Sequence, residues 1–414
     1  MAPGSRTARW LAMGVFLLAL ALNFLDRQLL AAIAPALKAE FHLSNAGYGE
    51  LISAFYFAYA AGVPLMGLLA DRVGLRISAL IADIVWSLAG ASTALGHGLG
   101  SLAASRAGLG FGESAGIPLV GKALGTYLDP AEMGISAGFG AIGISLGSIA
   151  APLFAATLVP RFGWRFVFVF AGALGLLWAP SWWYVSRRAA PRLEALTAPD
   201  IRVTELLADR RLWALTLAYG MVYSMYMLWA NWTTVYLVQD RHLSLTAANA
   251  GYAWLPPLFA IVGGFLGGGL AFRPIRAGAA PHAARVRACW LVSPLLLAGV
   301  FIPFLPGARW AALTIGAGFL AYQCMLGCLT IITVDLHGAR RAGFSNSVLG
   351  CAAALMQVLL APATGAVLDR VGFTPLCIAA PVVPLVGLIL LQLSFRRRPA
   401  ATAPPAGLSA EPDR

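Results

Sequence analysis

The chain contains twelve long apolar stretches separated by short polar segments. Each stretch holds roughly 20 residues, which is enough for an α-helix to cross the ~30 Å hydrocarbon core of a bilayer. Backbone groups in lipid must pair internally, and a β-barrel would need shorter, alternating strands. The pattern therefore predicts an all-α membrane protein. The twelve predicted transmembrane helices lie at about 10–35, 48–70, 77–97, 100–124, 133–159, 165–186, 212–238, 248–272, 287–305, 309–334, 343–367 and 374–395.

Composition excludes a water-soluble globule, because 59% of the residues are hydrophobic and only 11% are charged. Ordinary soluble domains carry about 25% charged residues. The net charge of +12 does not indicate nucleic-acid binding, since the basic residues lie in short clusters between apolar stretches rather than along one face. The lipid bilayer is the expected environment, and no nucleic-acid partner is expected.

A polar segment after the sixth stretch divides the chain into two halves. The segments 152–163 and 362–372 each run from a proline to a glycine at the end of the fifth and eleventh stretches, which indicates a duplicated unit. Parallel six-helix repeats are a transporter architecture with cargo bound near the midplane. The expected parts are an N-terminal six-helix bundle (1–188), a cytoplasmic linker (189–211), a C-terminal six-helix bundle (212–396) and a disordered cytoplasmic tail (397–414).

Most basic residues fall on the same side of the predicted spans as the N-terminus. Short loops rich in lysine and arginine prefer the cytoplasmic side. Both termini are therefore expected in the cytoplasm, with the protein in a bacterial-type inner membrane. The five cysteines and five histidines show no paired metal-ligand spacing, so no metal is expected. No cofactor is expected either, and a monomer is the expected state.

Five ionisable residues lie well inside the predicted spans, away from their ends, where a charge costs on the order of 2.5–3.5 kcal/mol. They are Asp26, Arg27, Asp83, Arg106 and Glu113. Arg106 and Glu113 share a helix face but lie roughly 10 Å apart, so each needs another partner, which Asp26 and Arg27 can supply. Asp83 is expected instead to pair locally with Arg76 or to reach the membrane interface.

The other four charges have the chemistry of a proton-coupled anion carrier. A guanidinium can hold a carboxylate through two hydrogen bonds, and a buried carboxyl can load and release a proton. The alternative is an ion-pair network that only joins helices. We favour the carrier, because four charges in lipid are costly for a purely structural purpose.

Several segments between residues 20 and 190 resemble the major facilitator superfamily. Within it they resemble the anion:cation symporters, which include bacterial sugar-acid transporters and the vesicular glutamate and sialic-acid carriers. The resemblance rests on Asn23-Phe24-Leu25-Asp26-Arg27, the loop from Gly67 to Arg76, Arg106 with Glu113, and Phe162-Gly163-Trp164-Arg165.

The resemblance implies a carrier that works by alternating access, with spans 1, 4, 7 and 10 lining the cavity. It implies proton binding by Asp26 and Glu113. The implied cargo contacts are Arg27, Arg106, Tyr59 and Tyr56. The implied cytoplasmic latch, which joins the bundles when the site faces outward, is formed by Gly67, Asp71, Arg72, Gly74 and Arg76. In the second half, where the resemblance is thinner, the candidate cargo contacts are Asn231, Trp232, Tyr322 and Asn346, with helix–helix hydrogen bonding as the alternative.

Phe24 stands where the family commonly has tyrosine, which removes one hydroxyl and favours a less hydroxylated anion. We expect proton-coupled uptake of a small organic anion, such as a sugar acid or another carboxylate. The alternative is a proton-antiporting exporter of drugs or siderophores. Enzymatic activity is not expected, because the spans show no nucleophile–base set and no metal ligands.

Overall fold

The computed structural model describes residues 5–128, 130–189 and 203–396. Helices occupy all twelve predicted stretches. The first half contains α1 (Arg6–Glu40), α2 (Asn45–Ser92), the 3₁₀-helix η1 (Thr93–Leu95), α3 (Leu99–Glu113), α4 (Gly116–Tyr127) and α5 (Pro130–Arg188). The second half follows the short helix α6 (Val203–Ala208). It contains α7 (Arg210–Gln239), α8 (Leu245–Ala248), the π-helix η3 (Asn249–Ala253), α9 (Leu255–Arg276), α10 (Pro281–Leu297), the 3₁₀-helix η4 (Ala298–Phe304), α11 (Gly307–His337), α12 (Ala339–Val371), α13 (Thr374–Ala379) and α14 (Val382–Arg396).

Eight helical segments of the described chain are long and apolar enough to cross a membrane. Two of them, in α2 and α5, reverse direction at Gly74 (φ 79°) and Gly163 (φ 78°), so each supplies two of the predicted crossings. Glycine adopts this left-handed conformation without steric cost. Gly372 (φ 72°) follows α12 as Gly163 follows the corresponding part of α5, which supports the predicted duplication.

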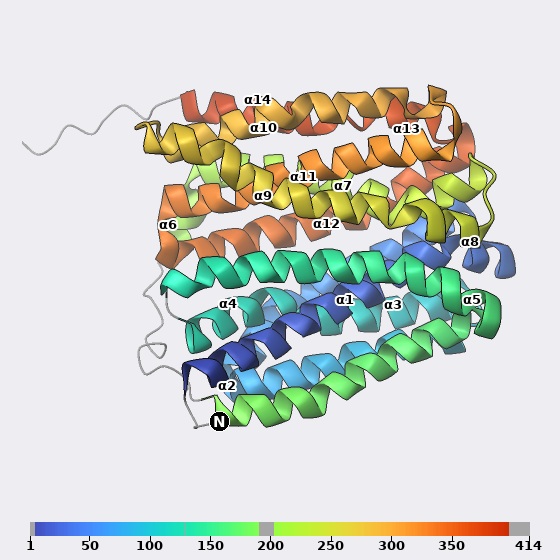
Figure 1. The fold of residues 1–414 in the computed structure, drawn as a ribbon, viewed down its shortest axis with the longest axis horizontal. Helices are drawn as coiled ribbons and strands as arrows, with labels where there is room; N and C mark the ends of the chain where they lie inside the picture. Colours follow the sequence, from blue (N-terminus) through green and yellow to red (C-terminus); the bar gives the residue numbers. More distant parts are fainter. Residues whose placement is uncertain (1–4, 129, 190–202, 397–414) are drawn as a thin grey trace, which may run out of the picture.

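The two halves pack side by side, with helices running roughly along the longest axis (Figure 1). The start of α1, the short helix α6 and the last turn of α14 lie at one end, which we call the terminal end. The turn between α1 and α2 and the helices α8 and α13 lie at the opposite end, which we call the far end. Part of the predicted linker (190–202) and the predicted tail (397–414) lie outside the described residues.

At the far end the two halves are closed against each other. The Asp369 carboxylate on α12 accepts hydrogen bonds from the backbone N–H groups of Asn45 (2.8 Å) and Ala46 (2.9 Å) at the start of α2. An anion at a helix N-terminus is favourable because unpaired N–H groups and the helix dipole point at it. Lys38 adds a hydrogen bond to the Asn45 side chain. α12 therefore caps α2 across the interface between the halves.

Close backbone packing at Gly365 makes this closure sensitive to side-chain size. A methyl group at Gly365 would overlap the carbonyl oxygen of Asn45 on α2. We therefore expect Gly365→Ala to shift the protein away from the state that is closed at the far end. Gly268→Ala is the matched control, because a methyl group there meets no atom within 4 Å. Spin labels on the exposed residues Glu50 and Arg370 should report a longer distance in the first variant and an unchanged distance in the control. An unchanged distance in both would contradict this account.

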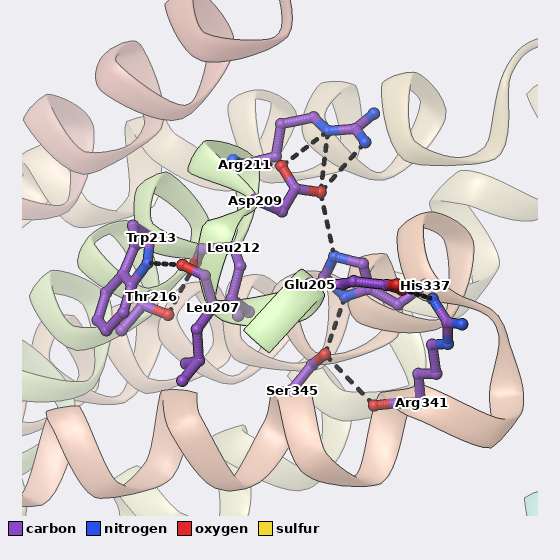
Figure 2. Close-up of polar contacts among 10 residues, drawn as sticks. All are labelled: Glu205, Leu207, Asp209, Arg211, Leu212, Trp213, Thr216, His337, Arg341 and Ser345. Carbon is purple, nitrogen blue, oxygen red and sulfur yellow. Dashed lines mark hydrogen bonds and ion pairs between the residues drawn. The ribbon is translucent and has the colours of Figure 1, made fainter. Parts of the chain in front are cut away.

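A polar cluster attaches α6 to the second half at the terminal end (Figure 2). Asp209 caps α7 by accepting a hydrogen bond from the Arg211 N–H (2.9 Å). His337 at the end of α11 lies 3.4 Å from the Asp209 carboxylate and 2.8 Å from the Ser345 hydroxyl. Arg341 adds an ion pair of 3.9 Å with Glu205. The described end of the linker is thus held by the turn between α11 and α12.

Candidate functional site

A cavity of about 460 Å³ lies between the two halves and extends from Arg27 toward the terminal end. Helices α1 to α5 supply most of its wall, and α7 and α12 supply the rest. The lining residues are Met13, Leu17, Leu20, Asn23, Phe24, Arg27, Tyr56, Tyr59, Glu113, Gly116, Val120, Leu124, Gly140, Ala141, Ile144, Tyr219, Tyr223, Gly350, Ala353 and Ala354.

An ion pair between Arg27 and Glu113 lies at the inner end of this cavity. Arg27 Nε and Nη2 donate to the same oxygen, Glu113 Oε2, at 3.0 and 2.7 Å. Both side chains are buried, at 8% and 0% exposed. Glu113 is the last residue of α3, and the helix breaks before α4 begins at Gly116. The fourth predicted span was expected to find partners for its charges in the first span, and this is confirmed for Glu113 and Arg27.

The two groups of this pair are not fully satisfied by each other. Glu113 Oε1 is buried and has no hydrogen-bond partner. Neither hydrogen bond to Glu113 uses Arg27 Nη1. The carboxylate thus has an oxygen where a proton can bind, and the guanidinium has a nitrogen that the bonds to Glu113 do not use.

Aromatic rings surround the Arg27 guanidinium. Its central carbon lies 4.7 Å from the centre of the Phe24 ring, 4.8 Å from Phe55 and 5.4 Å from Tyr59. The rings of Phe55 and Tyr59 are stacked, with their centres 5.9 Å apart. Ring faces attract a cation, and they also exclude water from it. The charge is therefore held in an environment where an anion would interact with it strongly.

Tyrosines connect the two halves across the cavity. The hydroxyl groups of Tyr56 on α2 and Tyr223 on α7 are 3.3 Å apart, and Tyr56 also donates to Met227 Sδ at 3.0 Å. Tyr219 and Tyr223 lie one turn apart, with stacked rings 6.0 Å between centres. Tyr219 and Tyr223 were not among the residues predicted from the sequence to contact the cargo. Their four-residue spacing on a span expected to line the cavity is the signal that would have found them.

Asp26 and Arg106 are buried beside the cavity rather than in its wall. The Asp26 carboxyl faces Gly90 on α2, and its Oδ2 has no hydrogen-bond partner. Arg106 lies 5.0 Å from the ring of Phe55, which also contacts Arg27, and its Nε and Nη1 are unpaired. No ion pair joins Asp26 to Arg106 in the described chain. The four charges expected around one shared cavity are therefore divided into one pair at the cavity and two residues next to it.

The four candidate contacts from the second half lie elsewhere. The Asn231 side-chain amide donates to the Met227 backbone carbonyl (2.9 Å), and the Asn231 backbone carbonyl accepts from the Tyr48 hydroxyl (3.0 Å). Trp232 packs edge-on against the Tyr48 ring with centres 4.9 Å apart. Tyr322 is 2% exposed and absent from the cavity wall. Asn346 accepts from the Thr333 hydroxyl (3.2 Å). In this structure Asn231 and Asn346 make hydrogen bonds within and between helices, as the stated alternative has it, and Trp232 and Tyr322 are packed in the core.

Asp83 does not pair with Arg76, so the first of the two alternatives predicted for it is wrong. Arg76 Nη2 donates instead to the Ser186 carbonyl on α5 at 2.6 Å. Asp83 is 0% exposed, and neither of its carboxyl oxygens has a hydrogen-bond partner. The positive group nearest to Asp83 along the helix is thus used by a neighbouring helix.

The segment predicted as a latch makes its contacts within the first half. Asp71 forms an ion pair with Lys122 on α4 (2.8 Å), and Gly74 supplies the turn of the chain. Gly67 and Arg72 belong to the same segment of α2. This segment lies at the terminal end of the molecule, toward which the cavity extends. A latch that joins the bundles only when the site faces outward would be released in this state.

The sequence model of the protein family Major Facilitator Superfamily matches residues 16–361 of this chain. The chain is 26% identical over 413 residues to the hexuronate transporter of Escherichia coli (strain K12), covering 95% of each. It is 27% identical over 278 residues to the galacturonate transporter of Dickeya chrysanthemi, covering 63% of this chain and 80% of that one.

A likeness to solved structures supports the fold. A bacterial homolog to the human lysosomal transporter Spinster, in an inward-facing and occupied conformation, superposes with a TM-score of 0.78. The two chains are 21% identical, and the match covers 95% of this chain and 98% of that one.

Proposed function

The chain belongs to the Major Facilitator Superfamily, and from this premise we propose that it carries a small organic anion across a membrane together with a proton. A sugar acid or another carboxylate is the proposed cargo. The observation that carries the proposal is the buried ion pair between Arg27 and Glu113 at the inner end of the cavity. The relatives named as hexuronate and galacturonate transporters support a carboxylate as cargo.

The ion pair links the cargo to the proton. While Glu113 is ionised, its carboxylate occupies two nitrogens of Arg27 and competes with any other anion. A proton on Glu113 removes that competition and leaves a buried guanidinium without a counter-charge, which is costly. A cargo carboxylate then restores the charge balance at Arg27. Proton and anion binding thus favour each other, which is the requirement for symport.

We assign Asp26 as the second proton-binding carboxyl and Arg106 as a gating residue or a partner for the charge of the cargo. Both side chains are buried, and both have polar atoms without a partner. Phe55 contacts both arginines, so a movement of Arg27 on cargo binding can be transmitted to Arg106.

Alternating access would use the two ends of the molecule in turn. Here the far end is closed by Asp369 and the cavity extends to the terminal end. With both termini in the cytoplasm, as the basic residues favour, this state would face inward. Opening the far end would separate α12 from α2 and bring the latch segment around Gly74 into contact with the other half.

An imposed pH gradient tests the proposal in proteoliposomes. If one proton accompanies each monovalent anion, an inward gradient of one pH unit is expected to drive about tenfold accumulation, because one unit corresponds to 1.36 kcal/mol. Labelled galacturonate and labelled benzoate serve as two carboxylate probes, and uptake into protein-free liposomes, which neutral benzoic acid enters unaided, is subtracted. Accumulation should disappear when an ionophore collapses the gradient. Counterflow of cationic solutes but of neither carboxylate would favour the exporter alternative and contradict the proposal.

A further inference from the structure

Building on the proposed function, we propose that the cargo is an aromatic monocarboxylate rather than a hydroxyl-rich sugar acid. The carboxylate would bind Arg27, and the ring would lie among the aromatic side chains that line the cavity. Three features of the cavity support this assignment: its charge, its shortage of groups that can bind sugar hydroxyls, and the placement of its rings.

The charge in the cavity wall fits one carboxylate. Among the described lining residues, Arg27 is the cation and Glu113 is the acid that proton binding would neutralise. Arg106 is absent from the wall and only 2% exposed. A second carboxylate on the cargo would leave water without reaching another cation, and an unpaired buried charge is strongly unfavourable. The site therefore fits a monoanion.

The wall offers few partners for a cargo with several hydroxyl groups. Among the described lining residues, the polar side chains apart from Arg27 and Glu113 are Asn23 and four tyrosines, and the others are aliphatic, methionine, glycine, alanine or Phe24. The Tyr56 hydroxyl already interacts with Tyr223 and Met227. A hydroxyl that loses water without gaining a partner weakens binding. A uronic acid would place several hydroxyls against apolar surface.

Aromatic rings line the cavity on two sides, one formed by the first half of the chain and the other by the second half. Phe24 and Tyr59 flank the guanidinium of Arg27 on the side of the first half. Tyr219 and Tyr223 present stacked rings from α7 on the side of the second half, next to the small residue Ala354 on α12. Aromatic pairs prefer offset or edge-to-face contacts with centres about 4.5–7 Å apart. A cargo ring close to its own carboxylate would reach both groups of rings.

Binding of a carboxylate panel to the purified, full-length protein tests this inference. The probes are benzoate, phenylacetate, cyclohexanecarboxylate, phthalate and galacturonate, measured by titration calorimetry and by the shift in apparent melting temperature. We expect benzoate or phenylacetate to bind at least about tenfold more tightly than galacturonate, with cyclohexanecarboxylate and phthalate weaker than the aromatic monoanions. Equal or tighter binding of galacturonate would overturn the inference and leave the proposed function intact. Absence of binding by every carboxylate would instead overturn the proposed function.

Substitutions at Tyr223 separate the ring from its hydroxyl. Tyr223→Leu is expected to weaken aromatic carboxylate binding by about fivefold to tenfold, and Tyr223→Phe should restore it to near the wild-type value. Galacturonate binding, if measurable, should not follow this order. An equal loss in the leucine and phenylalanine variants would show that the hydroxyl rather than the ring is recognised, which would contradict the inference. Any destabilised variant is identified by its melting temperature without ligand.

Discussion

Replacing Glu113 with glutamine is expected to abolish gradient-driven accumulation while exchange of labelled for unlabelled cargo continues. Glutamine keeps a carbonyl oxygen that can accept hydrogen bonds from Arg27, so the packing at the end of α3 is retained. The amide cannot take up or release a proton, so cargo binding is no longer linked to protonation. Under a gradient of one pH unit, the accumulation ratio should fall from about tenfold to about one.

The control for this variant is Glu50→Gln, which removes an acid from the exposed surface of α2. Its accumulation should match the wild type. Counterflow by Glu113→Gln shows that the variant is folded and still moves cargo. Wild-type accumulation by Glu113→Gln would remove this residue from the coupling mechanism.

Replacing Arg27 with alanine is expected to abolish cargo binding. Truncating one partner of a buried, hydrogen-bonded charge pair costs about 2–5 kcal/mol, which corresponds to a loss of at least about thirtyfold in affinity. Arg27→Lys should recover only part of the affinity, because an ammonium group cannot match a carboxylate with two parallel hydrogen bonds. Titration calorimetry with the tightest carboxylate of the panel provides the measurement.

Loss of folding is the competing explanation for a loss of binding in Arg27→Ala. The substitution leaves Glu113 buried without a counter-charge, and breaking a buried pair costs about 3–5 kcal/mol. The double variant Arg27→Ala/Glu113→Gln removes both charges and should recover stability without recovering binding. Cargo binding by the stable double variant at wild-type affinity would contradict the role of Arg27.

The fold was predictable because the membrane imposes length and hydrophobicity on every span. The twelve apolar stretches, and the glycines at 74 and 163 that reverse the chain, are visible without coordinates. The Arg27–Glu113 contact could also be predicted, because a charge buried in lipid needs a partner and the predicted spans contain few opposite charges. These predictions rest on requirements that hold wherever the helices pack.

The details that were wrong depend on which face of a helix meets which neighbour. Asp26 and Arg27 are consecutive, so they point about 100° apart and only one of them lines the cavity. Asp83 lies two turns from Arg76, but Arg76 donates its hydrogen bond to the Ser186 carbonyl on α5 instead. Asn231 is polar and lies on a helix expected to line the cavity, yet its side chain donates a hydrogen bond to the Met227 backbone carbonyl instead. Tertiary packing decided each of these cases.

The most direct test of the central claim is the movement of protons with the cargo. Proteoliposomes containing a trapped pH indicator are prepared without a pH gradient, and the tightest carboxylate of the panel is added outside with the membrane potential clamped. Wild-type protein is expected to acidify the lumen faster than protein-free liposomes do as the anion enters, whereas Glu113→Gln should acidify it no faster than protein-free liposomes. Entry of the anion through the wild-type protein without acidification would contradict the account.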